Sequence, residues 1–108
     1  WAETVLDNHP EWSVELIDLR TLVPWDQKMV CESVSKTGKA LVLHEATRTG
    51  GVGGEISAVI HENCWRSLDA PVARTASLDT PVPFATDLER EFMANCRLEA
   101  DLETLLNR

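Results

Sequence analysis

The sequence lacks any long apolar run, and basic residues are scarce in it. No run approaches the roughly 18 apolar residues of a membrane-spanning helix, so we expect neither a membrane span nor a signal peptide. Ten Lys and Arg residues stand against 18 Asp and Glu residues, which gives a formal net charge of −8. This charge disfavours nucleic acid and anionic membranes as partners, because both attract basic surfaces, and it favours a basic protein partner.

Cysteine is also scarce. Cys31, Cys64 and Cys96 are widely spaced and odd in number, which favours a reducing, cytoplasmic compartment. A length of 108 residues suits one domain over residues 1–108 with a modest core. Because the chain begins at Trp1 instead of Met, we expect it to be a piece of a longer protein.

Glycine is concentrated in one place: four of the five glycines lie between positions 50 and 54. The apolar run Ala40–Leu43 precedes them and is typical of a strand covered on both faces, away from a sheet edge. Apolar residues at helical spacing follow and predict a helix from about 54 to 66. The glycine turn therefore lies at the carboxyl end of a strand, where open α/β sheets bind ligands or partners.

This turn lacks the residues that a nucleotide site needs. A dinucleotide fingerprint that includes Gly51 and Gly53 would need a third glycine where Ile56 stands. A phosphate loop would need Lys followed by Ser or Thr, but Glu55 and Ile56 occupy those positions. Glu55 also places negative charge near the helix N-terminus. We therefore favour a packing turn or a contact with another subunit over phosphate binding.

Catalytic and metal-binding motifs are incomplete as well. The pair His44-Glu45 begins like a zinc-protease motif, but Arg48 stands where the second His is required. His61 and Cys64 lie one helical turn apart, but the sequence offers no second pair of metal ligands to complete a site with them. The residues alone thus predict an acidic α/β domain with no catalytic, cofactor-binding or metal-binding residues of its own.

The predicted fold is a three-layer α/β/α domain with a mostly parallel sheet, since strands and helices alternate. Asp26 is the expected N-cap, and Gly38 the expected C-terminal stop, of one helix. Thr86 and Glu89 predict a capping box for another. The expected strands are Val14–Leu19, Ala40–Glu45 and Pro71–Ala76, and the expected helices cover 1–8, 27–37, 54–66, a short stretch from 86, and a last segment that includes Leu98, Leu102, Leu105 and Leu106.

Four motifs occur in a recognisable order: residues 14–22 (VELIDLRTL) followed by Pro24, then HEA-RTGG-G from His44 to Gly53, LDAPVAR from Leu68, and DTPVP from Asp79. Together they resemble the C-terminal domain of the β subunit, or fused β part, of thiamin-diphosphate-dependent 2-oxo acid dehydrogenases. This domain belongs to the transketolase C-terminal domain superfamily, and the resemblance covers essentially the whole chain. Members of the family act on pyruvate, branched-chain 2-oxo acids or acetoin.

The resemblance implies a division of labour. Decarboxylation and acyl transfer to lipoyl-lysine take place at thiamin diphosphate with Mg²⁺, between the α part and the N-terminal domain of the β part. Neither lies in this chain, so the fragment alone is expected to be inactive and to bind no cofactor. The C-terminal domain is implied to pair β subunits and to dock the basic subunit-binding domain of the acyltransferase core. The implied partners are therefore the α part, a second β part and this core, within a cytoplasmic oligomer.

Three residues are predicted to bind partners. Asp69, in the Leu-Asp-Ala-Pro motif, is the position that the resemblance implies for docking, and the alternative is a solvent-facing turn residue. Gly51 and Gly53 suit close backbone approach by another polypeptide. Relatives also carry a central strand before Trp1-Ala2, in a sheet of five whose first strand is antiparallel, so the fold of this chain lacks it. The alternative function, from a different class, is a stand-alone module that binds an anionic small molecule at the glycine turn.

Overall fold

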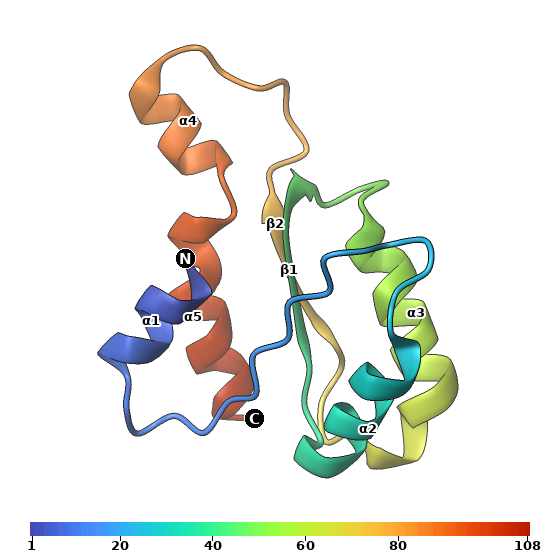
Figure 1. The fold of residues 1–108 in the computed structure, drawn as a ribbon. Helices are drawn as coiled ribbons and strands as arrows, with labels where there is room; N and C mark the ends of the chain where they lie inside the picture. The colour runs from blue at the N-terminus through green and yellow to red at the C-terminus, as the bar shows by residue number, and fades with distance from the viewer.

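The computed structural model describes all 108 residues, which form five α-helices, one short 3-10 helix and two strands (Figure 1). The helices are α1 (Ala2–Asn8), α2 (Gln27–Thr37), α3 (Val52–Cys64), α4 (Thr86–Phe92) and α5 (Asn95–Leu106), the 3-10 helix is η1 (Trp65–Ser67), and the strands are β1 (Leu41–Thr47) and β2 (Ala73–Ser77).

The two strands form a parallel sheet in which Leu41 pairs with Ala73 and Leu43 with Thr75. Parallel strands need a crossover connection, and α3 supplies it. Helices α3 and α2 lie on one side of the sheet, whereas α5 lies on the other side with α1 packed against it (Figure 1). The predicted α/β fold, with a parallel sheet between two helical layers, is therefore confirmed.

Helix α2 has the boundaries that its capping residues predict. Oδ1 of Asp26 accepts a hydrogen bond from the backbone N–H of Met29 at 3.1 Å, which satisfies a free donor at the helix start. Gly38 ends the helix in the left-handed conformation, with φ of 80°. Between these caps, Val30 and Val34 face inward and form one buried cluster with Ile56, Ile60 and Cys64.

The segment Val14–Leu19 is not a strand, so this prediction is wrong. The segment forms no ladder with either strand. Glu15 instead accepts a hydrogen bond from Ser33 of α2 at 2.5 Å, and Ile17 and Leu19 are half-buried against the cluster between α2 and α3. The sequence pattern predicts which side chains face inward, but a strand also needs a neighbouring backbone to pair with.

Strand β1 lies at an edge of the sheet, because only β2 is bonded to it. Ala40–Leu43 is half-buried, so the expectation of a fully covered strand away from an edge is wrong. An apolar run shows that a strand can bury both of its faces, but the number of its neighbours depends on segments elsewhere in the chain. Strand β2 begins at Ala73, two residues later than Pro71, where the sequence predicts its start.

The region around α4 projects away from the three-layered body (Figure 1). Thr86 is the first helical residue and Ala85 is the N-cap, without a side-chain hydrogen bond, so the predicted capping box is absent. The loop before the helix is irregular, as its two prolines predict. Val82 and Phe84 in this loop are exposed.

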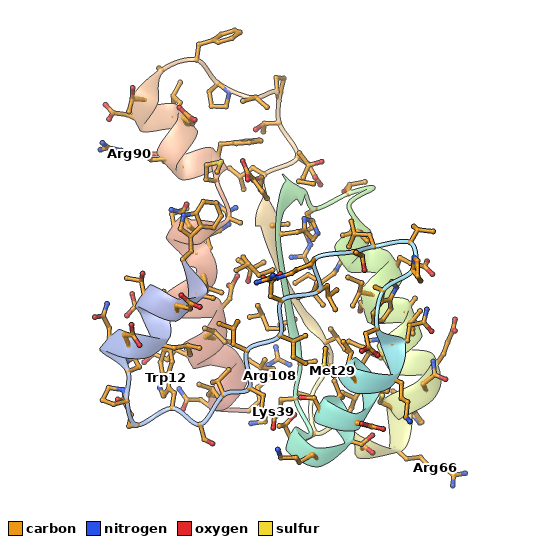
Figure 2. All side chains as sticks on the ribbon, in the orientation of Figure 1. Trp12, Met29, Lys39, Arg66, Arg90 and Arg108 are labelled. Atoms are coloured by element: carbon orange, nitrogen blue, oxygen red, sulfur yellow. The ribbon has the colours of Figure 1, made fainter.

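Lys39 joins the start of β1 to the end of α5. Its Nζ donates hydrogen bonds to the carbonyl oxygens of Leu106 at 3.2 Å and Arg108 at 2.7 Å (Figure 2). Carbonyl groups at a helix C-terminus have no partner within the helix, and a cation is favourable there. Lys39 therefore anchors the last turn of α5 beside the sheet.

We expect Leu98→Ala to lower the free energy of unfolding by about 3 kcal/mol, because the substitution leaves a cavity in the α5 layer. Leu98 is 1% exposed, whereas Leu88 on α4 is 56% exposed. Leu88→Ala is the matched control and should change the free energy by less than about 0.5 kcal/mol. Chemical denaturation of both variants measures the difference, and equal losses would contradict the assignment of the core.

Candidate partner-binding site

The glycine turn packs around His44 of the same chain. The pairing of β1 with β2 is irregular between Leu43 and Thr47, and His44 lies in this bulge, with its Nδ1 at 3.0 Å from the carbonyl oxygen of Ala46. A Cβ atom at Gly51 would lie 2.5 Å from Cε1 of His44, and one at Gly53 would lie 2.5 Å from its Nε2. Real side chains do not approach so closely, so the imidazole requires both glycines.

This packing explains within the chain why both positions are glycine, and contact of Gly51 and Gly53 with a partner stays a prediction. Gly53 is buried in the first turn of α3, and Gly51 is the half-buried N-cap. The close approach that we expected from another polypeptide is made by His44, so Gly53 offers a partner almost no surface. A substitution at Gly53 would weaken folding itself and cannot isolate assembly. The exposed side of the turn, at Thr49 and Gly50, is open to a partner.

The two nitrogens of His44 have different surroundings. Nδ1 bonds to a carbonyl group, which can only accept, so Nδ1 is the nitrogen that carries the proton. Nε2 is buried against Gly53 without a hydrogen-bond partner. The side chain therefore acts as a packing group at the end of β1, with one internal hydrogen bond. Because it fills the space beside the glycines, the structure gives no support to an anion site at this turn.

Asp79 ties the glycine turn to the loop that follows β2. Its Oδ1 accepts a hydrogen bond from the backbone N–H of Thr49 at 2.8 Å, and its Oδ2 accepts one from the Thr49 hydroxyl at 2.5 Å. These two bonds lower the pKa of Asp79, and the nearby positive charge of Arg48 lowers it further. Asp79, in the loop after β2, thus holds the start of the glycine turn in place through Thr49.

Asp69 lies at the opposite end of the sheet from the glycine turn. Its backbone N–H donates to the carbonyl oxygen of Gly38 at 2.7 Å, and its carboxylate lies beside the Cα of Gly38. The residue is exposed and its side chain forms no hydrogen bond or ion pair in the chain. The structure therefore does not bring Asp69 together with Gly51 and Gly53, and these residues cannot form one compact partner site.

The remaining candidate side chains are engaged within the chain. Nδ1 of His61 lies 2.8 Å from the carbonyl oxygen of Ser57, and Sγ of the buried Cys64 faces the carbonyl oxygen of Cys31 at 3.8 Å. Burial, with a smaller effect of Cys64, raises the pKa of the Cys31 thiol to about 11, so this thiol is a poor nucleophile. No three His, Cys, Asp or Glu residues are grouped to hold a metal ion. None of the helices has the length and apolar character that crossing a membrane requires.

These features define a class of protein, an α/β/α domain with a parallel sheet. Most of the candidate polar side chains in it form hydrogen bonds within the chain. The family described as "Transketolase, C-terminal domain" matches residues 2–97. The chain belongs to the transketolase C-terminal domain family, as its motifs predict.

Named relatives are β subunits of 2-oxo acid dehydrogenases. The chain is 58% identical over 71 residues to "2-oxoisovalerate dehydrogenase subunit beta 2, mitochondrial" of Arabidopsis thaliana, which covers 66% of this chain and 20% of the relative. It is 43% identical over 84 residues to "2-oxoisovalerate dehydrogenase subunit beta" of Bacillus subtilis, with 77% and 26% covered. It is 46% identical over 84 residues to "Pyruvate dehydrogenase E1 component subunit beta" of Staphylococcus epidermidis, with 78% and 26% covered. The chain thus matches about a quarter or less of the length of each.

We expect Gly53→Ala to destabilise the fold by about 1–3 kcal/mol, because the added methyl group overlaps the His44 ring. Gly54→Ala is the control in the same helix, since its Cβ would meet only Arg74, at 3.5 Å. It should be neutral or stabilise by about 0.5–1 kcal/mol, because alanine favours the helix. Thermal denaturation measures both, and His44→Ala in the Gly53→Ala background should recover part of the loss.

Asp79→Asn should lower the denaturation midpoint at pH 7, and the difference from the parent should shrink in acid. The pKa of Asp79 is lowered in the folded state, so its stabilising effect is present above the ordinary value of about 3.8 and is lost as pH falls through the folded value. Urea denaturation at pH 7 and at about pH 2.5 tests this. Asp7→Asn, at an exposed carboxylate without a hydrogen bond, is the control, and a difference at Asp79 that stays constant with pH would contradict the assignment.

Proposed function

We propose that this chain is the C-terminal, non-catalytic assembly domain of the β part of a 2-oxo acid dehydrogenase. The observation that carries the proposal is the 58% identity over 71 residues to a 2-oxoisovalerate dehydrogenase β subunit. In the full enzyme, thiamin diphosphate and Mg²⁺ carry out the decarboxylation in other domains. The role of this chain is to pair β parts, to contact the α part and to dock the acyltransferase core.

Exposed apolar side chains support a role in assembly. Val23 is 97% exposed, and Phe84 is fully exposed on the loop that projects before α4. Val82 and Leu88 lie near Phe84 in sequence and are also exposed, at 64% and 56%. Apolar side chains gathered on one projecting segment mark contact sites in soluble proteins, and an exposed aromatic residue is a frequent anchor of an interface. We therefore assign subunit contacts to the α4 region first, and to the exposed side of the glycine turn second.

Docking of the acyltransferase core is assigned to the end of the sheet that carries Asp69. The Asp69 carboxylate has no partner in the chain, so a cationic side chain of another protein can pair with it directly. The net charge of −8 favours the approach of a basic domain from a distance. These two features fit a small, basic docking domain.

The substrate class is a 2-oxo acid, and the names of the relatives include both 2-oxoisovalerate and pyruvate dehydrogenases. Assays of the complete enzyme with the two acids decide between them. The Arabidopsis relative is named as mitochondrial, whereas the Bacillus name carries no compartment. Location in the cytoplasm therefore remains a prediction. A complete enzyme that transfers no acyl group to lipoyl-lysine from either acid would contradict the proposed function.

Asp69→Lys should weaken binding of the acyltransferase core by roughly tenfold at low salt, because it replaces attraction with repulsion. The effect should shrink as salt screens the charges. Binding of the complete enzyme to the core is measured by surface plasmon resonance. Glu62→Lys, at an exposed position of α3, is the matched control for net charge.

The same Asp69→Lys enzyme should keep its rate of decarboxylation with an artificial electron acceptor, because the cofactor site is assigned to other domains. An equal loss of core binding in the Glu62 variant would mean that only net charge matters. Loss of the uncoupled rate would place Asp69 near the active site and overturn the docking role.

A further inference from the structure

The α4 arm, residues 79–93, is attached to the body mainly at its end. It carries the exposed apolar side chains to which we assign subunit contacts, Val82, Phe84 and Leu88. No helix or strand packs along the length of α4, which projects away from the sheet (Figure 1). Phe92 is the one buried residue of α4, and its carbonyl oxygen accepts a hydrogen bond from the N–H of Leu78 at 3.1 Å. The orientation of the arm therefore depends on a few interactions near Phe92.

Arg97, in the first turn of α5, provides most of the polar interactions at this junction. Its Nη1 donates to the carbonyl oxygen of Glu91 at 2.9 Å, and its Nη2 donates to those of Ala76 and, at 3.4 Å, Phe92. Glu91 and Phe92 end α4, and the last carbonyl groups of a helix have no partner within it and favour a cation. Arg97 forms no ion pair, so its guanidinium serves these backbone oxygens.

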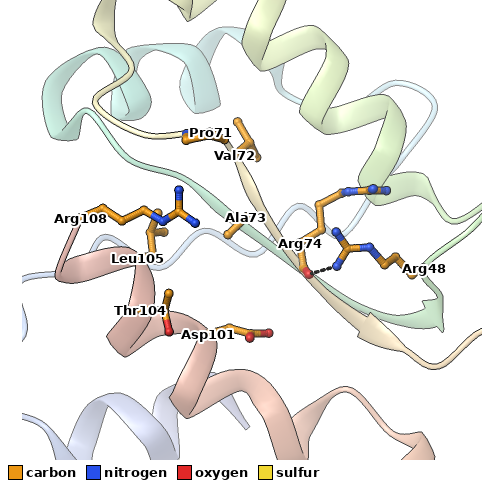
Figure 3. A pocket seen from close by; sticks show the side chains of 9 residues that line it. All are labelled: Arg48, Pro71, Val72, Ala73, Arg74, Asp101, Thr104, Leu105 and Arg108. Atoms are coloured by element: carbon orange, nitrogen blue, oxygen red, sulfur yellow. Dashed lines mark hydrogen bonds between the residues drawn. The ribbon is translucent and has the colours of Figure 1, made fainter.

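The third carbonyl group belongs to the outer edge of β2. The N–H of Ala73 points to β1, so the backbone groups of Arg74 and Ala76 point away from β1. Arg48 donates to the carbonyl oxygen of Arg74 at 3.0 Å (Figure 3), and Arg97 donates to that of Ala76. The Arg48 contact covers the edge alone. Arg97 joins the edge to the end of α4 as well.

Few other side chains could make these bonds together. A guanidinium carries five N–H donors in a rigid planar fork, whereas the ammonium group of lysine is a compact point charge. It could serve the sheet edge or the helix end, but not both. The Cys96 thiol also faces the carbonyl oxygens of Glu91 and Met93, at 3.7 and 3.1 Å, but a thiol is a weak donor. Arg97 is therefore the main polar link between the arm and the sheet.

We propose that Arg97 fixes the orientation of the α4 arm on the sheet and thereby presents Phe84 and Leu88 to the partner subunit. Arg97 is a positioning residue, since it acts through the carbonyl groups at the base of the arm. The inference rests on the proposed assembly function and adds the residue that determines the geometry of the contact. An arm without this link keeps its apolar side chains but no longer holds them in one arrangement, so association has to order them at an entropic cost.

Arg97→Gln in the complete enzyme should weaken subunit assembly about tenfold, as for the loss of charge-assisted hydrogen bonds. Analytical ultracentrifugation over a range of concentrations measures assembly, and hydrogen–deuterium exchange of the dissociated subunit measures protection of α4 and α3 separately. Exchange should become faster in α4 and stay unchanged in α3. Equal acceleration in both helices would mean a general loss of stability and would overturn the positioning role.

Arg90→Gln is the matched control, because Arg90 lies exposed on α4 and forms no ion pair (Figure 2). It removes the same charge and should change neither assembly nor exchange. Arg97→Lys keeps the charge but not the fork, so it should weaken assembly nearly as much as Arg97→Gln. Full assembly of the lysine variant would show that charge alone suffices and would overturn the proposal.

Phe84→Ala separates this inference from the proposed function. It should weaken assembly while protection of α4 stays unchanged, because Phe84 is fully exposed and supports nothing within the chain. Weak assembly of Phe84→Ala with normal assembly of Arg97→Gln would overturn the role of Arg97 and leave the assigned contact intact. Normal assembly of Phe84→Ala would overturn the contact assigned to the arm, and with it the presentation of Phe84 to a partner.

Discussion

The parallel pairing of β1 with β2 is the constraint on which the rest of the structure depends. Two strands that run in the same direction force the chain to cross one face between them, and α3 makes this crossing. The crossing places the start of α3 beside the end of β1, so that His44 lies against Gly51 and Gly53. It leaves the other face to α5, which buries Leu98 there. The ladder also creates the outer edge of β2, where Arg48 and Arg97 donate hydrogen bonds to the carbonyl oxygens of Arg74 and Ala76.

The sequence predicts elements well where the determining interactions are local. The caps of α2 at Asp26 and Gly38 depend on residues within one helical turn, and both are confirmed. Residues 14–19 have as clear an apolar pattern, but they pair with no strand, because pairing is a non-local property. The pattern still predicts which side chains of this segment face the core. The predicted cap at Thr86 is absent because α4 begins at Thr86 itself, one residue earlier than an N-cap at this position requires.

The candidate site shows the same limit in more detail. The glycine cluster correctly indicates a close approach, yet the sequence does not say that the approaching group is His44, seven and nine residues earlier in the chain. A histidine at the end of a strand, followed at this spacing by two glycines, is a signal that could have indicated internal packing. The two aspartates differ for the same reason: Asp79 is held by Thr49, whereas the Asp69 carboxylate has no partner. Only the three-dimensional arrangement separates a structural carboxylate from one that is open to a partner.

Net charge and local charge act at different ranges in this molecule. The formal charge of −8 repels anions and attracts basic domains at distances up to the Debye length, about 8–10 Å at ordinary ionic strength. Single guanidinium groups act instead over hydrogen-bond distances that salt screens much less, as Arg48 and Arg97 do at the carbonyl oxygens of Arg74 and Ala76. For the docking proposed at Asp69, the net charge would steer a basic domain from a distance, and the carboxylate would then pair with it directly.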